Sequence, residues 1–287
     1  MKLVNGKVEK NEKLARWFEQ SVDGYSFNDL MRALRNRDVK INGVRVNADI
    51  KLTAGDNVEI YLPEKSKVNV EIVFEDDNII VVNKPTGVLS VDDNGTRQTM
   101  ESVVNQLCPG ALPVHRLDRN TAGLMIFAKS QKILDVLIKA TKAGEIGKSY
   151  LAWVYGKFPE KVNSEAYLFS DKKQARSIVS AVKKQGYEQI KTDFKLIKTN
   201  GEVSLVEAKL HSGKLHQVRA HLAFLGYALV GDGLYAKHED FNKTKQKHHQ
   251  LLAYKIEFKL NKNNVLSYLN NCKVELKTQK FSNIFKI

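Results

Sequence analysis

The chain has 287 residues, 43% of them hydrophobic and 8% aromatic, enough for one large core or for a large domain with a small one. Its 46 lysines and arginines outnumber 32 aspartates and glutamates, and the net charge of +14 favours nucleic acid as the partner, although a generally lysine-rich composition gives the same balance. With two distant cysteines, no apolar signal segment and no run of about 20 apolar residues, the sequence excludes a disulfide framework, a zinc ribbon and a membrane span, so we expect a cytoplasmic monomer.

Residues 1–65 predict a small α+β domain of their own. Apolar residues at helical spacing predict one helix over 11–22 and a second over 26–38, with Ser26 as the N-cap of the second. The apolar stripe of the second helix is expected at Phe27, Leu30, Met31 and Leu34.

The end of this first domain carries turn and strand signals. Asn42-Gly43 lies between two short alternating segments and is the strongest local signal for a hairpin. The stretch "LTAGDNVEIYLP" adds another turn and a strand. The charged residues "PEKSK", 63–67, predict a linker, so a second domain is expected over 68–287.

Residues 68–287 predict one larger α+β unit. Alternating or continuous apolar segments indicate strands, and two periodic stretches indicate amphipathic helices. Residues 163–198 are lysine-rich and predict short strands without a strong helix. The other expected strands are 70–74, 79–82, 122–130, 148–156, 202–210, 250–260 and 272–278, and the expected helices are 130–144 and 215–226.

Several motifs that resemble known chemistry fail on spacing. The stretch "GEIGKS" ends like a phosphate-binding loop, but it has Lys142 where that loop needs glycine, and it follows a predicted helix rather than a strand. His216 and His221, five residues apart, diverge around a helix, so no spacing among the seven histidines predicts a metal site. There is no Gly-x-Ser-x-Gly elbow for a serine nucleophile.

Three residues remain as candidates for a shared site: Asp118 in "HRLDRNTAGL", Tyr150 in "KSYLAWVYG" and Arg219 in "GKLHQVRAHLAFLG". A carboxylate beside an arginine stays ionised at neutral pH, which suits a nucleophile or a base. A nearby tyrosine offers an aromatic face and a phenol for proton transfer. Each residue also has an ordinary interpretation, as a turn former, a core aromatic or a solvated helix residue, and these alternatives stay open on the residues alone.

The stretch "HRLDRNTAGL" resembles the catalytic motif of the RluA-type pseudouridine synthases, His-Arg-Leu-Asp-x-x-Thr-Ser-Gly-Leu. Three further blocks resemble that family and follow in its order: "EDDNIIVVNKPTGVLS", "KSYLAWVYG" and "LHSGKLHQVRAHLAFLGYALVGDGLY". Together they cover roughly residues 70 to 258. The resemblance implies the α+β pseudouridine synthase fold, a mixed and mostly antiparallel central sheet with flanking helices and loops.

The resemblance also implies an isomerase that converts uridine in RNA to pseudouridine without a cofactor or a metal. Asp118 would be the essential carboxylate, attacking either the ribose anomeric carbon or the uracil ring. Arg219 would hold Asp118, Tyr150 would stack on the uracil, and Arg116 would fill the place of the flipped base. Further RNA contacts would come from Lys84, Lys214, His216, Gln217 and His115, the last with a structural role as its alternative.

The stretch "MRALRNRDVKINGVRV" resembles the small S-four-type (αL) RNA-binding domain, which one branch of that family carries at its N-terminus. The resemblance implies a basic face for structured RNA, made by Arg32, Arg35, Arg37 and Lys40. The alternative is that these residues merely solvate a helix. By resemblance the partner is large-subunit (23S) ribosomal RNA or a pre-ribosomal particle, with rRNA processing as the role, whereas some relatives act on transfer RNA.

Four positions depart from the family pattern. Ala122 replaces the usual serine of the turn, Lys214 and Leu215 replace arginine and threonine, and Leu252 replaces a histidine. A lysine keeps the charge but loses bidentate phosphate binding. Because the three candidate catalytic residues are unchanged, we expect an active enzyme; a non-catalytic RNA-binding or ribosome-assembly protein on the same scaffold is the alternative.

Overall fold

The computed structural model describes residues 1–22, 25, 27–62, 68–91, 98–171, 173–244 and 246–284. The chain divides into two compact units, Met1–Asn69 with Val91–Val103, and Val70–Ser90 with Val104–Ile287. The expected N-cap Ser26 and the expected linker 63–67 lie outside the described residues, and the proposed boundary between 65 and 68 stays a prediction. Within the described ranges, none of the helices combines the length and the apolar character needed to cross a membrane.

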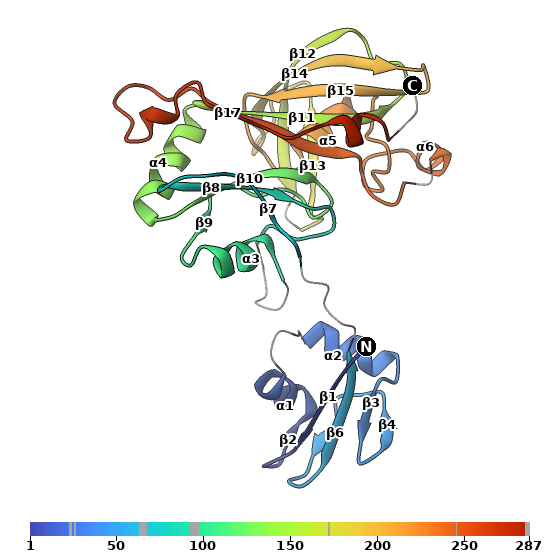
Figure 1. Cartoon of the computed structure of the whole chain (residues 1–287). Coiled ribbons are helices and arrows are strands. Elements are labelled where there is room, and N and C mark those ends of the chain that lie inside the picture. The colour runs from blue at the N-terminus through green and yellow to red at the C-terminus, as the bar shows by residue number, and fades with distance from the viewer. Residues whose placement is uncertain are drawn as a thin grey trace. The chain divides into compact units, whose positions relative to one another are not determined.

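The first unit is a four-stranded antiparallel sheet with two helices, in the strand order β1-β6-β3-β4 (Figure 1). Buried apolar residues of both helices and of the sheet form one core. The elements are β1 Lys2–Lys7, β2 Glu12–Lys13, α1 Leu14–Ser21, α2 Phe27–Arg35, β3 Val39–Ile41, β4 Val44–Val46, β5 Lys51–Leu52 and β6 Asn57–Leu62.

Local turn chemistry sets the hairpin of this unit. Asn42 and Gly43 have φ of 51° and 81°, the positive values that a type I′ turn requires, so the predicted hairpin is confirmed. Two expectations were incomplete. Strand β1 was not predicted, and Phe27 does not belong to the buried stripe of α2, because it begins the helix at 44% exposure while burial begins at Leu30.

The second unit is built on a mixed sheet of eleven described strands, in the order β13-β12-β14-β15-β11-β16-β10-β8-β7, with β17 beside β16 and β9 beside β10 (Figure 1). Among these strands the pairing of β10 with β16 is parallel and the others are antiparallel. The strands are β7 Glu71–Glu75, β8 Ile79–Lys84, β9 Leu112–Pro113, β10 Ala122–Ala128, β11 Ile146–Tyr155, β12 Lys161–Asp171, β13 Arg176–Ser180, β14 Glu188–Thr199, β15 Val203–Leu210, β16 Leu251–Phe258 and β17 Lys273–Glu275.

Helix α4, Gln131–Lys142, packs its apolar face on β10 and β11 and closes the main core cluster. Its N-cap is Ser130, whose hydroxyl accepts from the backbone N–H of Ile133, and the helix lies within the expected range 130–144. Helix α5, Gln217–Phe224, is the second expected helix, and it ends before Gly226. The shorter helical elements are α3 Met100–Leu107, α6 His238–Lys243, η1 Ser267–Leu269 and α7 Gln279–Ser282.

The expectation of short strands over 163–198 was wrong in length. Strands β12 and β14 have 11 and 12 residues and pair with each other over eight positions. Their inner faces carry a small apolar set, including Ala166, Leu168 and Ile190, while the outer faces mix charged and polar residues with Tyr167 and Phe169. The charged and polar positions hide the period-two pattern from a search for apolar runs.

Gly123 lies where β10 meets β16 in parallel, and its φ of 117° suits glycine. A Cβ there would lie 2.2 Å from the carbonyl oxygen of Ala253. We therefore expect Gly123→Ala to lower the free energy of unfolding by about 3 kcal/mol or more, measured by chemical denaturation. Gly110→Ala is the matched control, since Gly110 also has positive φ but open space around it, and should cost about 1–2 kcal/mol. Equal losses would show that steric contact with β16 is not the cause.

Candidate active site

Asp118 lies in the loop between β9 and β10, and this loop is fixed from both sides. Its backbone carbonyl accepts from the N–H of Thr121, 3.0 Å away, which closes a turn. One residue earlier, Leu117 exchanges two hydrogen bonds with the buried hydroxyl of Ser90. The Thr121 hydroxyl lies 2.9 Å from His249 Nε2. The turn chemistry and these buried contacts give the Asp118 backbone a defined position.

Lys84 is fully buried and holds the same loop through a hydrogen bond to Arg119. The prediction that Lys84 contacts RNA is therefore wrong. Burial lowers the pKa of Lys84 to about 8, although the charge of Asp118 opposes that shift. All three protons of an ammonium are used, because Nζ donates to the carbonyls of Pro85, Val88 and Arg119 at 3.0, 2.7 and 2.9 Å.

Arg219 projects from α5 and joins two carboxylates. Its Nη1 donates to Asp118 Oδ2 at 2.8 Å. Its Nε and Nη2 donate to Asp232 Oδ2 and Oδ1 at 2.8 and 3.0 Å, a bidentate pair. Burial would raise the pKa of Asp232, but the hydrogen bonds and charge of Arg219 outweigh burial and hold that pKa below its ordinary value. Asp232, whose side chain is fully buried, thus orients the guanidinium toward Asp118.

Asp232 was not among the residues singled out from the sequence. Its motif, "GDGLY", was part of a block that resembled the synthase family, and that motif was the available signal. A buried arginine needs a buried counter-charge, so a search for the partner of Arg219 could have found it.

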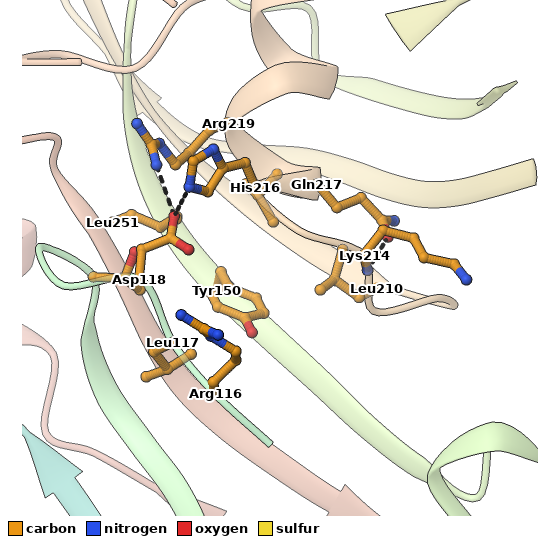
Figure 2. A pocket seen from close by; sticks show the side chains of 12 residues that line it. Arg116, Leu117, Asp118, Tyr150, Leu210, Lys214, His216, Gln217, Arg219 and Leu251 are labelled. Atoms are coloured by element: carbon orange, nitrogen blue, oxygen red, sulfur yellow. Dashed lines mark hydrogen bonds and ion pairs between the residues drawn. The ribbon is translucent and has the colours of Figure 1, made fainter. Parts of the chain in front are cut away.

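Tyr150, on β11, lines the same pocket as Asp118 and Arg219 (Figure 2). The cavity volume of this pocket is about 60 Å³, smaller than a site that encloses a whole small molecule, so the pocket is a shallow depression open to solvent. Burial and the Asp118 charge raise the pKa of Tyr150, so the phenol is protonated at neutral pH. Arg116 lies exposed on the pocket wall. The structure therefore brings together four residues that the sequence proposed, from the β9–β10 loop, β11 and α5.

Two further predicted RNA contacts point inward. Gln217 is buried, and its amide is used within the fold: Oε1 accepts from Ser212 and from the N–H of Lys214, and Nε2 donates to Thr192. The prediction that Gln217 contacts RNA is wrong for that reason. His115 accepts from the N–H of Ile126 at 3.3 Å, and burial lowers its pKa well below the ordinary value, so the contacts favour its structural alternative.

Lys214 and His216 remain at the pocket wall. Lys214 forms an ion pair with Glu188 and is partly exposed, so it would have to leave Glu188 to contact RNA. His216 is the N-cap of α5 and has φ of 52°, a left-handed conformation. Its Nε2 lies 3.5 Å from Asp118 Oδ2, so its ring faces the carboxylate. RNA contacts by these two residues stay predictions.

The matching family model decides the identity. It describes an RNA pseudouridylate synthase and matches residues 78–224, a range that contains Asp118, Tyr150 and Arg219. The chain belongs to the RNA pseudouridylate synthase family. It is therefore an isomerase that acts on RNA, as the resemblance implied.

Three curated relatives of the synthase support this family. An uncharacterized RNA pseudouridine synthase of Mycoplasma capricolum is 31% identical, over 94% of this chain and 95% of that protein. The mitochondrial tRNA pseudouridine(32) synthase of Saccharomyces cerevisiae is 32% identical, over 72% of this chain and 47% of its own length, so the match spans about half of the yeast enzyme. Ribosomal large subunit pseudouridine synthase C of Escherichia coli is 28% identical, over 80% and 78% of the two chains.

A solved structure confirms the predicted fold of the synthase. Human RNA pseudouridylate synthase domain containing 1 superposes with a TM-score of 0.59 at 22% identity, over 76% of this chain and 95% of that chain. The mostly antiparallel mixed sheet is thus the pseudouridine synthase fold. The family match begins at residue 78 and leaves the first 77 residues outside it.

Those residues hold the second group of RNA contacts predicted for the synthase. Arg32 and Arg35 are exposed on α2, and Arg37 follows them, also exposed, with φ of 59°. Lys40 is half-buried, 3.8 Å from Glu59 and over the ring of Tyr61. Three of the four predicted cations are thus exposed within this unit, although Arg32 lies 4.0 Å from Asp29, whereas Lys40 is half-buried.

Proposed function

We propose that the synthase isomerises specific uridines of large-subunit ribosomal RNA with Asp118 as the attacking carboxylate. The observation that carries this proposal is the 2.8 Å pair between Asp118 Oδ2 and Arg219 Nη1 in a pocket that Tyr150 also lines. The guanidinium orients the carboxylate through a charge-assisted hydrogen bond, and an oriented carboxylate is what attack requires.

The proposed reaction follows from these groups. The carboxylate of Asp118 forms a transient bond to the bound nucleotide, and the bond from ribose to N1 of uracil breaks. The ring then bonds to the ribose through its carbon 5, the bond to Asp118 breaks and regenerates the carboxylate, and the proton of carbon 5 leaves to solvent while N1 takes up a proton. Tyr150 supports the uracil through its aromatic face, because its phenol is protonated at neutral pH and is not a resting base. Arg116, on the exposed wall, enters the stack that the flipped uridine leaves.

Relatives named for different RNAs define two candidate substrates, and the choice between them is testable. The Escherichia coli relative is named for the ribosomal large subunit and favours ribosomal RNA, whereas the yeast relative is named for transfer RNA and keeps transfer RNA as the second candidate. Both RNA fractions, labelled with tritium at carbon 5 of uracil, would be prepared from cells that lack this gene. We expect the purified synthase to release tritium from the large ribosomal RNA, and release from transfer RNA alone would overturn the ribosomal assignment.

For residues 1–65 we propose an S-four-type RNA-binding role. The accessible Arg32 and Arg35 on α2 support it, as does the sequence resemblance of the following hairpin. We expect the double variant Arg32→Glu and Arg35→Glu to weaken RNA binding by about tenfold or more and to flatten its salt dependence, with little change in the rate on saturating RNA. The measurement is a binding titration at several salt concentrations.

Arg16→Glu is the control for this charge reversal, since Arg16 lies exposed on α1 of the same unit. A similar loss of affinity for Arg16→Glu would assign the effect to net charge, and unchanged binding of the double variant would contradict the proposed RNA face.

A further inference from the structure

The side chain of His216 lies between the catalytic pocket and Tyr235. Its Nε2 is 3.5 Å from Asp118 Oδ2, and its Nδ1 is 3.1 Å from the Tyr235 hydroxyl. Figure 2 shows the contacts of Arg219 and His216 converging on one oxygen of Asp118. Each ring nitrogen of His216 therefore faces one polar partner, Nε2 facing Asp118 and Nδ1 facing Tyr235.

Strand β13 fixes this arrangement from behind. The backbone N–H of Ser177 donates to the Tyr235 hydroxyl at 2.7 Å. The Ser177 hydroxyl donates to the carbonyl of Leu215 at 2.5 Å, which anchors the residue before His216. One residue of β13 thus holds both the ring partner and the backbone of His216, and the strained left-handed conformation persists because of this support.

The hydrogen bonds determine which ring nitrogen carries the proton. The Tyr235 oxygen accepts from the backbone N–H of Ser177, and the acceptors near its own proton are Nδ1 of His216, 3.1 Å away, and the Ser177 hydroxyl. Because Nε2 faces the carboxylate of Asp118, we assign the proton of the neutral ring to Nε2, which leaves Nδ1 to accept from the Tyr235 hydroxyl. An ionised carboxylate only accepts and would repel an unprotonated Nε2.

We propose that His216 is a positioning residue for Asp118, held as the neutral Nε2–H tautomer by Tyr235 and donating to Oδ2. His216 and Arg219 together restrain Oδ2 of Asp118. Among the described residues, no hydrogen bond or ion pair involves Oδ1. Oδ1 is therefore the oxygen that attacks. This inference rests on the proposed role of Asp118.

A neutral donor suits this position. Burial lowers the pKa of His216, and the nearby guanidinium of Arg219 acts in the same direction, while Asp118 opposes them. A second full cation would stabilise the carboxylate charge that must be donated during attack, whereas a neutral N–H orients it. The 3.5 Å separation fits a contact that shortens when the substrate closes the pocket, as catalytic hydrogen bonds do.

Two substitutions separate positioning from folding. His216→Gln places an amide N–H near Nε2, whereas His216→Asn keeps a polar group near Nδ1 and cannot reach Asp118. Asparagine is well tolerated in the left-handed conformation and glutamine is not, so a folding defect would harm the glutamine variant more. We expect the reverse order in activity.

The test is the rate of tritium release from carbon-5-labelled RNA, with kcat and KM measured for both variants. His216→Gln should keep kcat within about threefold, and His216→Asn should lower kcat by about tenfold or more at nearly constant KM. Equal kcat values for the two variants, high or low, would overturn the proposal. Activity in Asp118→Asn would instead overturn the proposed function, so the two failures are distinguishable.

A second measurement reads the tautomer directly in the full chain. In protein labelled with nitrogen-15 at histidine, the ring signals that disappear in His216→Gln are assigned to His216. We expect a neutral ring protonated at Nε2 at pH 7, and in Tyr235→Phe a mixture of both tautomers. A ring protonated at Nδ1, or at both nitrogens, in the wild type would overturn the proposal.

Discussion

Replacing Asp118 with asparagine is expected to lower the rate of tritium release from carbon-5-labelled RNA by at least about 1000-fold, because the reaction loses its nucleophile. The amide keeps the size of the carboxyl group and an oxygen that accepts from Arg219 Nη1, so the loop should stay folded. RNA affinity should change little, which separates chemistry from binding.

The control for this substitution is Asp135→Asn, which removes an exposed carboxylate of α4 with no place in the pocket. It should leave the rate unchanged. A rate for Asp118→Asn within about tenfold of the wild type would contradict a nucleophilic role, since the loss of a covalent nucleophile is larger than that.

Arg219→Met is expected to cost both activity and stability. The variant leaves the buried carboxylate of Asp232 without its bidentate partner and frees Asp118 from its restraint. Removing one partner of a buried ion pair costs about 3–5 kcal/mol in free energy of unfolding. Thermal or urea unfolding measures it, and Arg176→Met, at an exposed position on β13, should change stability by less than about 0.5 kcal/mol.

The pH dependence of that loss identifies its cause. In the wild type the pKa of Asp232 is held below its ordinary value, so this group stabilises the fold above the unfolded-state pKa, and its contribution is lost as pH falls through the folded-state pKa. In Arg219→Met the N–H groups of Leu234 and Tyr235 still donate to Asp232, but the main opposition to burial is gone and the pKa of Asp232 rises. The folded variant then takes up a proton more readily than the unfolded chain. The difference in free energy of unfolding between the wild type and Arg219→Met should therefore become smaller as the pH falls from about 7 to about 5. A difference independent of pH would assign the loss to packing.

Much of the fold could be predicted from local patterns. Asn42-Gly43 specifies its turn through backbone conformation alone, and the apolar segments of β8 and β10 are buried on both faces. Strands β12 and β14 were predicted too short because charged and polar residues interrupt their apolar positions, and β1 was missed because its two apolar residues, Leu3 and Val4, are adjacent and give no period. These strands depend on tertiary pairing, which local sequence does not encode.

The site was predicted through motifs rather than through geometry. Asp118, Tyr150 and Arg219 come from distant segments, and the blocks that carry them follow the order of one family; in the structure they line one pocket. Lys84 and Gln217 were assigned to RNA because they are polar residues in the matched blocks, but their partners lie within the fold, largely backbone groups that carry no sequence signal. The orientation of the His216 side chain depends on the left-handed backbone conformation of this N-cap residue, which no local sequence pattern predicts.

The central claim is that this chain isomerises uridine rather than cleaving it. The most direct test incubates carbon-5-tritiated ribosomal RNA from cells lacking the gene with wild-type protein and counts released tritium against pseudouridine in the digested product. We predict one pseudouridine for each tritium released, no free uracil, and neither product with Asp118→Asn. Tritium release without pseudouridine, free uracil in its place, or equal turnover by the variant would contradict the account.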